Sequence, residues 1–231
     1  MSFSLKEIVP WGRSFDEYVA MFALSDEDLG KRILGCGDGP AAFNAGLTGR
    51  GGRVVSADPL YRFAADDIRR RIHETYPDVM AQTRQNSHEF TWTSISSAEE
   101  LGRIRMDAME KFLTDFPRGR EQGRYVEAEL PRLPFSDREF DVAVCSHLLF
   151  LYSEQLSADF HVTSIRELCR VAAEVRIFPL LELGAKKSRH LEAVARMLPD
   201  AGYNQGVVTV DYEFQRGGNQ MMVVKRNGRK L

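Results

Sequence analysis

The sequence predicts an α/β fold: one doubly wound sheet of seven strands, mostly parallel, that ends in an antiparallel hairpin. Three observations predict it. Short runs rich in Val and Ile alternate with helical stretches along most of the 231 residues. A turn rich in glycine, ILGCGDGPAAFNAG over 33–46, follows the first of these runs. The last two runs follow one another with no helical stretch between them, as in a hairpin.

Five of the expected strands precede the hairpin. Each is brief and is bounded by Gly, Pro, Asp or Ser, and the expected ranges are 32–35, 53–57, 124–128, 140–146 and 174–179. Helices are expected over 40–47, 63–76 and 165–173, and a further one where Leu191, Val194, Ala195 and Leu198 recur at helical spacing. This alternation is typical of parallel strands joined by helical crossovers.

The hairpin is expected from GVVTVDYEF over 206–214 and QMMVVK over 220–225. The link QRGGN, 215–219, holds two glycines in five residues, which suits a turn between antiparallel strands.

The chain is longer than this sheet needs. From Asp58 to the next strand near Arg124 there are more than sixty residues, whereas a strand–helix–strand crossover commonly takes about thirty. The stretch is mostly helical, and Ser97-Ala-Glu-Glu100 matches a helix capping box. We therefore expect a single domain over 1–231 that carries a helical insertion at about 77–123.

Composition excludes several classes of protein. Hydrophobic residues make up 43% and charged residues 28% of the chain, as in globular proteins, and the net charge of −2 makes a nucleic-acid partner unlikely on charge grounds. No apolar run approaches the ~18 residues of a membrane helix, and the start MSFSLKEIVPWGR lacks an export signal, so no membrane association is expected. Cys36, Cys145 and Cys169 form no paired motif, which indicates reduced thiols and a cytoplasmic protein. The five histidines show no metal-ligand spacing, so no metal site is expected.

The glycine turn indicates a binding site. Gly35, Gly37 and Gly39 leave the backbone bare, and Pro40 suits the first turn of a helix. Free N–H groups at the start of that helix would favour an anionic ligand group. The alternative is a turn that only connects two elements. The spacing departs from the dinucleotide pattern G-x-G-x-x-G, which disfavours NAD, and the Walker lysine motif is absent.

A carboxylate follows the second strand. Asp58 ends VVSAD, nineteen positions after Gly39, where it could accept hydrogen bonds from both hydroxyls of a ribose. Its alternative role is to cap the next helix. Together, the turn and the carboxylate indicate an adenosine-type ligand across the strand ends.

Four motifs in this order resemble the class I S-adenosylmethionine-dependent methyltransferases, which have a Rossmann-like fold. They are ILGCGDG, VVSADP, ELPRLPFSDREFDVAVCSHLL and the terminal hairpin, and they span about residues 30–225 apart from the insertion. The resemblance implies S-adenosyl-L-methionine as cofactor. It implies that the glycine turn lies beneath the methionine part, that Asp58 holds the ribose, and that Glu129 with the Leu130 backbone lies near the adenine. Glu129 has an alternative reading as a solvated loop acid.

The chain departs from the family at one position. Where the family usually has an acid, two residues before the first glycine, this chain has Ile33. The cofactor's ammonium group would then meet Asp38 or a main-chain carbonyl.

The N-terminal segment WGRSFDEYVAMFALS resembles the family's lead-in segment, so Arg13 or Tyr18 could meet the methionine carboxylate; alternatively Tyr18, Met21 and Phe22 simply pack. The expected cofactor contacts are Gly35, Cys36, Gly37, Asp38, Gly39, Asp58, Pro59, Glu129, Leu130, Ser146 and Arg13.

One catalytic residue is expected. The fourth strand ends in Cys-Ser-His-Leu-Leu over 145–149, which in this family projects toward the methyl group, and His147 could accept a proton from the acceptor. The alternative is a histidine that caps the next helix or bonds main chain. Neither an Asn/Asp-Pro-Pro-aromatic tetrad at this strand end nor a Pro-Cys dipeptide is present, which disfavours two nucleic-acid methylation mechanisms.

We therefore expect a cytoplasmic methyltransferase that acts on a small molecule. Phe90, Trp92, Arg103, Arg105 and Lys111 of the insertion could roof the acceptor pocket, or the insertion could be a solvated hairpin or a homodimer surface. Alternatives are an RNA or protein methyltransferase, for which Arg118, Arg120 and Arg124 would form one positive face, and a protein that binds the cofactor without catalysis.

Overall fold

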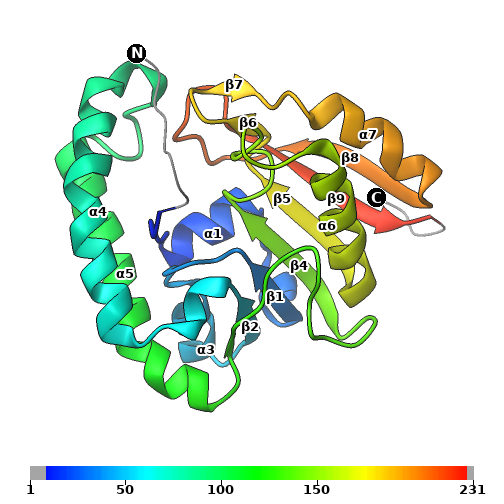
Figure 1. The fold of residues 1–231 in the computed structure, drawn as a ribbon, viewed down its shortest axis with the longest axis horizontal. Helices are drawn as coiled ribbons and strands as arrows, with labels where there is room; N and C mark the ends of the chain where they lie inside the picture. The colour runs from blue at the N-terminus through cyan, green and yellow to red at the C-terminus, as the bar shows by residue number, and fades with distance from the viewer. Residues whose placement is uncertain (1–8, 228–231) are drawn as a thin grey trace.

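A seven-stranded sheet forms the centre of the computed structural model, which describes residues 9–227 (Figure 1). The strand order is β3-β2-β1-β4-β5-β9-β8; β1 to β5 run parallel, and β9 runs antiparallel to both β5 and β8. This confirms the expected fold class. The strands are β1 Arg32–Cys36, β2 Arg53–Ala57, β3 Tyr125–Val126, β4 Phe140–Ser146, β5 Ala172–Phe178, β8 Tyr203–Thr209 and β9 Gln220–Arg226. Of the start MSFSLKEIVPWGR, in which no export signal is expected, residues 1–8 lie outside the described residues.

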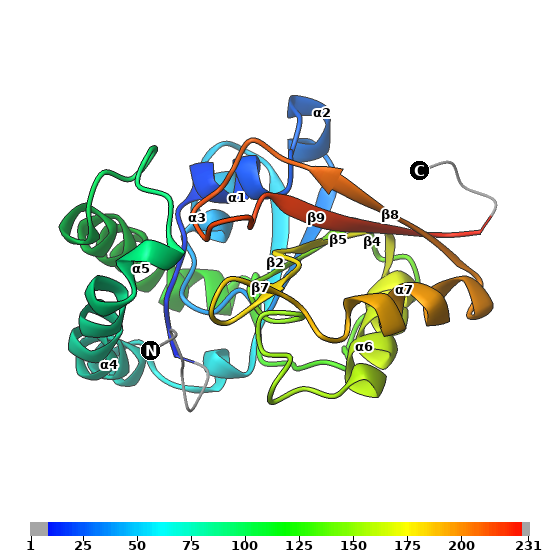
Figure 2. The same cartoon turned by 90° about the horizontal axis from the view of Figure 1, so that it is seen from above.

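Helices cover both faces of the sheet (Figure 2). Helices α1 (Phe15–Met21) and α3 (Phe43–Gly49) pack on one face with the short α2 (Asp26–Leu29) nearby, while α6 (Ala158–Val171) and α7 (Leu191–Asp200) cover the other. Because apolar side chains of β1 and β4 alternate between these two layers, both central strands are buried almost throughout.

A pair of long helices stands beside the sheet as a separate arm (Figure 1). They are α4 (Ala65–Gln85) and α5 (Ala98–Glu121), with the short 3-10 turns η1 (Pro59–Arg62) and η2 (Ser87–Glu89) before and between them. Helix α4 runs without interruption through Pro77, so the boundary expected there lies inside a helix. Buried Ile72, Val79 and Met80 pack on either side of Pro77 and offset the hydrogen bond that proline removes.

Several elements differ from the sequence expectation in length. Helix α3 begins at Phe43 rather than at Pro40, and the Ala42 N–H just before it donates to the Arg13 carbonyl oxygen at 2.9 Å. Strand β8 ends at Thr209, and the chain then leaves the sheet so that the Thr91 N–H can bond Phe214 O at 2.8 Å. A small hairpin of β6 (Leu181–Glu182) and β7 (Lys186–Lys187) was not expected.

The two long helices, α4 and α5, carry charged residues along their whole length. Within residues 9–227, no helix combines the length and the apolar character needed to cross a membrane.

Candidate functional site

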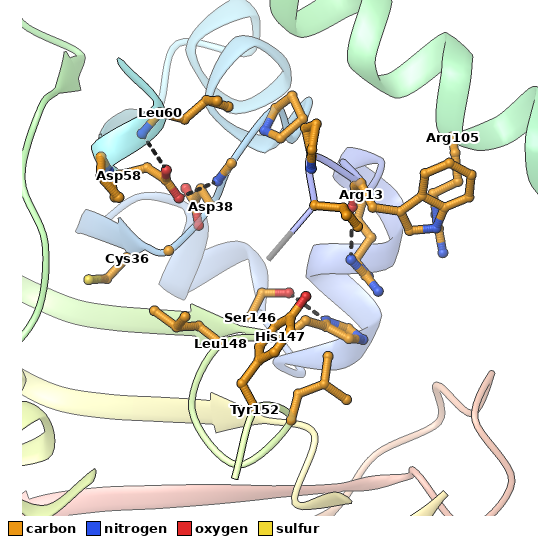
Figure 3. Close-up of a pocket in the computed structure, with 18 of the residues that line it drawn as sticks. Arg13, Cys36, Asp38, Asp58, Leu60, Arg105, Ser146, His147, Leu148 and Tyr152 are labelled. Atoms are coloured by element: carbon orange, nitrogen blue, oxygen red, sulfur yellow. Dashed lines mark hydrogen bonds between the residues drawn. The ribbon is translucent and has the colours of Figure 1, made fainter. Parts of the chain in front are cut away.

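A cavity of about 1220 Å³ opens over the carboxyl ends of β1, β2 and β4, between the sheet and the arm (Figure 3). The turn after β1, Asp58 after β2 and Ser146 to Leu148 at the end of β4 line it, and Trp11, Arg105 and Phe214 line it from the N-terminal segment, the arm and the 210–219 loop. Ligands of open parallel sheets bind at this edge, where neighbouring crossovers leave in opposite directions. Every expected cofactor contact except Gly35 lines this cavity.

The glycine turn is crowded at two positions and open at the third. A Cβ on Gly35 would lie 1.8 Å from Asp38 Oδ2, and one on Gly37, whose φ is +70°, would lie 2.7 Å from Leu148 Cδ2. The protein's own side chains therefore explain the first two glycines. Gly39 has a φ of +52°, and no heavy atom of residues 9–227 lies within 4 Å of its Cβ direction. Bare backbone at Gly39 therefore faces open space in the cavity.

Asp58 joins the glycine turn to the start of η1 beneath the cavity. Its Oδ1 accepts from the Leu60 N–H at 2.8 Å and so caps η1, and its Oδ2 accepts from the Gly39 N–H at 2.8 Å. Asp58 therefore does cap the next helix, which was its alternative role. Each carboxylate oxygen still has a second lone pair that can accept a hydrogen bond from a ligand, and Asp58 lines the cavity together with Pro59. Burial raises the pKa of the Asp58 carboxyl, although both N–H groups favour its charged form.

Asp38 turns inward from the glycine turn. Its carboxylate accepts from the Tyr18 hydroxyl at 2.9 Å and from Ser56 Oγ at 2.6 Å. Burial raises the pKa of Asp38 to about 7 against the opposing effect of these two hydrogen bonds. Ile33, at the position where the family has an acid, is fully buried among apolar side chains, so Asp38 is the acid next to the turn.

His147 follows the end of β4, next to Ser146. Its Nδ1 lies 2.8 Å from Ser146 Oγ. The residue has a φ of +54°, and its backbone N–H donates to Phe178 O at 2.7 Å. Burial, then the charges of Arg13 and Arg105, hold the pKa of His147 well below its usual range, so its imidazole is neutral near pH 7. It does not cap α6, whose N-cap is Ser157.

Arg105 meets a buried carboxylate, that of Glu17, on the far wall of the cavity. Arg105 Nη1 donates to Glu17 Oε2 at 2.5 Å, and the Tyr212 hydroxyl donates to Glu17 Oε1 at 2.9 Å. Arg13 Nη1 donates to the Trp11 carbonyl oxygen at 2.9 Å. Sequence reasoning missed Glu17 and Tyr212. The Ser14-x-x-Glu17 spacing signals a helix cap, which Glu17 does form, and it gives no sign of a partner 88 positions away.

The remaining expected residues divide between cavity and core. Glu129 is exposed at the cavity rim and Leu130 is buried beside it. Met21 and Phe22 are fully buried and pack in the core, as the alternative held. Phe90 lines the cavity and stacks on Phe214 with ring centroids 4.8 Å apart.

Two charge-based expectations can also be placed. Arg124, one of three arginines considered for a positive face, pairs with Asp115 at 2.7 Å and has a side chain only 13% exposed, so it adds little to such a face. Within the part of the chain that the structure describes, no three His, Cys, Asp or Glu side chains are arranged to hold a metal ion.

The strand order, the reversed terminal strand and the cavity over the parallel strands give the chain a Rossmann-like class I methyltransferase fold. No family model matches the sequence. The chain belongs to the same family as the uncharacterized protein MJ0045 of Methanocaldococcus jannaschii, to which it is 30% identical over 224 residues, 96% of this chain and 98% of the other.

Solved structures are similar at a lower level. A magnesium protoporphyrin IX methyltransferase from Synechocystis, crystallised with S-adenosylhomocysteine, is 13% identical with a TM-score of 0.47, over 92% of this chain and 81% of the other. A SAM-dependent methyltransferase from Aquifex aeolicus is 17% identical with a TM-score of 0.43, over 91% of this chain and 87% of the other. At these values the fold assignment rests on the strand order and not on the similarities.

Proposed function

We propose that this protein transfers a methyl group from S-adenosyl-L-methionine to a small-molecule acceptor. The observation that carries the proposal is the Asp58 carboxylate, which is hydrogen-bonded to the Gly39 amide and lies on the floor of a cavity that ends at His147. The cavity of about 1220 Å³ exceeds the ~300–1,000 Å³ common for one ligand, which leaves room for a cofactor and an acceptor together.

The residues present fit this cofactor. A side chain at Gly39 would enter the cavity, so bare backbone there admits a ligand directly onto the turn. Asp58 has lone pairs left for the ribose hydroxyls, with Pro59 beside it. Glu129 and Leu130 line the same cavity, and we assign Glu129 and the Leu130 backbone to the adenine. Cys36 to Gly39 would lie beneath the amino-acid part, with Asp38 as the acid nearest its ammonium group and Ser146 at the opposite strand end.

When bound, S-adenosyl-L-methionine supplies an electrophilic methyl carbon whose bond to sulfur breaks as the acceptor's atom attacks. The protein contributes alignment and a place for the acceptor's proton. The neutral imidazole of His147 carries one N–H, and its Nδ1 lies within hydrogen-bond distance of Ser146 Oγ. We assign the N–H to Nδ1, which leaves His147 Nε2 as the unprotonated nitrogen. We propose that this nitrogen accepts the acceptor's proton.

A small-molecule acceptor is supported by the apolar lining of the site. Leu148, Leu151, Phe178 and Phe214 line the cavity beside His147, and the arm and the 210–219 loop border it on the far side. This setting favours a compact apolar molecule over a segment of polymer.

Calorimetry with S-adenosylhomocysteine tests the proposal. We expect the wild type to bind it, and Asp58→Asn to bind at least tenfold more weakly, whereas Asp66→Asn, an exposed acid on the arm, binds as the wild type does. Since Asp58 also caps η1, a second pair separates binding from folding: Glu129→Gln should weaken binding and Glu127→Gln, exposed two residues earlier, should not. Absence of binding by the wild type, for both S-adenosylmethionine and S-adenosylhomocysteine, would refute the proposal.

A further inference from the structure

Two guanidinium groups, those of Arg13 and Arg105, lie on the wall of the cavity, and only Arg105 is paired with a carboxylate. Arg105 is 1% exposed and pairs with Glu17. Arg13 lies next to it, and among the described residues no ion pair is found for Arg13, whose polar contact is the Trp11 carbonyl oxygen. The Nε atoms of Arg13 and Arg105 are buried and have no hydrogen-bond partner within residues 9–227. This wall therefore carries an excess of positive charge and unused donors.

An uncompensated buried charge is unfavourable unless an anion joins it. Burial, followed by repulsion from Arg105, lowers the pKa of Arg13 to about 10, so the group remains charged at neutral pH. A guanidinium offers a planar fork of donors that matches a carboxylate with two parallel hydrogen bonds. The missing partner on this wall is therefore an anionic ligand group.

The surroundings of the pair are aromatic. The rings of Phe178 and Tyr212 meet edge-on with centroids 5.7 Å apart, and the His147 ring meets Phe178 in the same way at 5.6 Å. The Tyr212 hydroxyl donates a hydrogen bond to Glu17, the carboxylate that pairs with Arg105. A continuous wall therefore runs from His147 over two aromatic rings to the arginines, with Trp11 and Tyr152 also lining the cavity.

The position of the pair separates it from the cofactor's nucleoside seat. Figure 3 shows Asp58 and Arg105 on opposite sides of the cavity, with Arg13 between them. Arg105 comes from α5 and Tyr212 from the loop after β8, elements outside the glycine turn and the strand ends.

We propose that Arg13 and Arg105 bind a carboxylate of the methyl acceptor, and that the acceptor is an aromatic acid whose nucleophilic atom reaches His147. This rests on the proposed methyltransferase function and names its substrate class. The family resemblance offers another source of the same chemistry, the methionine carboxylate of the cofactor at Arg13, and the experiment separates the two.

The test uses matched pairs of acid and amide: 4-hydroxybenzoate against 4-hydroxybenzamide, and 6-hydroxy-2-naphthoate against its amide. Binding is measured by calorimetry with the free protein and with its S-adenosylhomocysteine complex. We expect the complex to bind at least one acid tenfold more tightly than its amide. Arg13→Gln should abolish this preference and keep its affinity for S-adenosylhomocysteine, whereas Arg103→Gln, exposed on the same helix as Arg105, should keep both.

Other outcomes contradict the inference in distinguishable ways. Arg13→Gln could lose tenfold in affinity for S-adenosylhomocysteine and still bind 5′-methylthioadenosine, which lacks the amino-acid carboxylate, as the wild type does. In that case the arginines bind the carboxylate of the cofactor and not that of the acceptor. If the wild-type complex binds acids and amides equally, or binds neither, the acceptor is not an aromatic acid although the proposed function stands. If the wild type fails to bind S-adenosylhomocysteine, the proposed function fails with it. Arg13→Lys keeps the positive charge but lacks the planar pair of guanidinium donors. Its preference for the acid over the amide should lie between those of the wild type and Arg13→Gln, and it replaces Arg13→Gln in the test if that variant does not fold.

Discussion

Gly39 shows at the scale of one residue why the turn after β1 is bare. Its φ is +52°, and a Cβ there would enter the cavity instead of meeting protein atoms. Gly51 is a matched control, since its φ is +81°, its Cβ direction is equally open among the described residues, and it lies outside the cavity lining.

We expect Gly39→Ala and Gly51→Ala to lose similar stability, about 1 kcal/mol each, because both place a Cβ in left-handed backbone. Only Gly39→Ala should lose affinity for S-adenosylhomocysteine, by at least tenfold, which calorimetry would measure alongside urea unfolding. Equal affinities in the two variants would show that no ligand approaches the turn.

Asp38 makes stability depend on pH. Its pKa rises from an unfolded value near 3.8 to about 7 in the fold, so the folded state holds a proton that the unfolded chain has released. Stability is then lost as pH rises from about 4 to about 7, and the part between pH 5.5 and pH 8 is about 2 kcal/mol.

The difference in unfolding free energy between the wild type and Asp38→Asn measures this effect. As pH rises from 5.5 to 8, the wild type should lose about 2 kcal/mol of unfolding free energy relative to Asp38→Asn. In Ser56→Ala the carboxylate loses a donor, so the loss of stability should extend to higher pH. A difference independent of pH would contradict the assignment.

A buried side chain, that of Glu17, joins helix α1 to helix α5 of the arm. Glu17 accepts from Ser14, from Arg105 on α5 and from Tyr212 in the loop after β8. Burial alone would raise the pKa of Glu17, but Arg105 holds it at about 2, so the carboxylate is charged at neutral pH.

Glu17→Gln leaves the buried Arg105 guanidinium without its carboxylate, and we expect it to lower the free energy of unfolding by about 3–5 kcal/mol. The control is Asp107→Asn, which removes an exposed partner of Lys111 on α5 and should change stability by less than about 0.5 kcal/mol. Urea unfolding measures both. A loss below about 1 kcal/mol in Glu17→Gln would show that this contact does not hold the arm to α1.

The bounds of helices and strands could be predicted from the sequence where neighbouring residues determine them. Strands β1, β2 and β4 carry apolar runs ended by Gly, Asp or Ser, and their expected and observed ranges agree closely. The expected start of α3 was wrong by three residues, since 40–42 lie in a turn and bend before the helix. The expected end of β8 was wrong because distant backbone decides it: Phe214 O accepts a hydrogen bond from the Thr91 N–H. No local pattern reports such a partner.

At the scale of the whole molecule, the sequence predicts one half of the cavity better than the other. The turn, Asp58, Glu129 and His147 follow parallel strands, so strand order alone brings them to one edge. The opposite wall joins α1, α5 and the loop after β8, which are far apart along the chain, and Glu17 and Tyr212 there were not anticipated. The inward turn of Asp38 toward Tyr18 and Ser56 likewise depends on tertiary packing.

A crystal structure of the protein grown with saturating S-adenosylhomocysteine tests the central claim most directly. The account predicts the nucleoside in the cavity, with its ribose hydroxyls on the Asp58 carboxylate, its adenine beside Glu129 and Leu130, and its sulfur between the glycine turn and His147. A cavity that stays empty, or that Tyr18 and Leu148 fill with their own side chains, would contradict it.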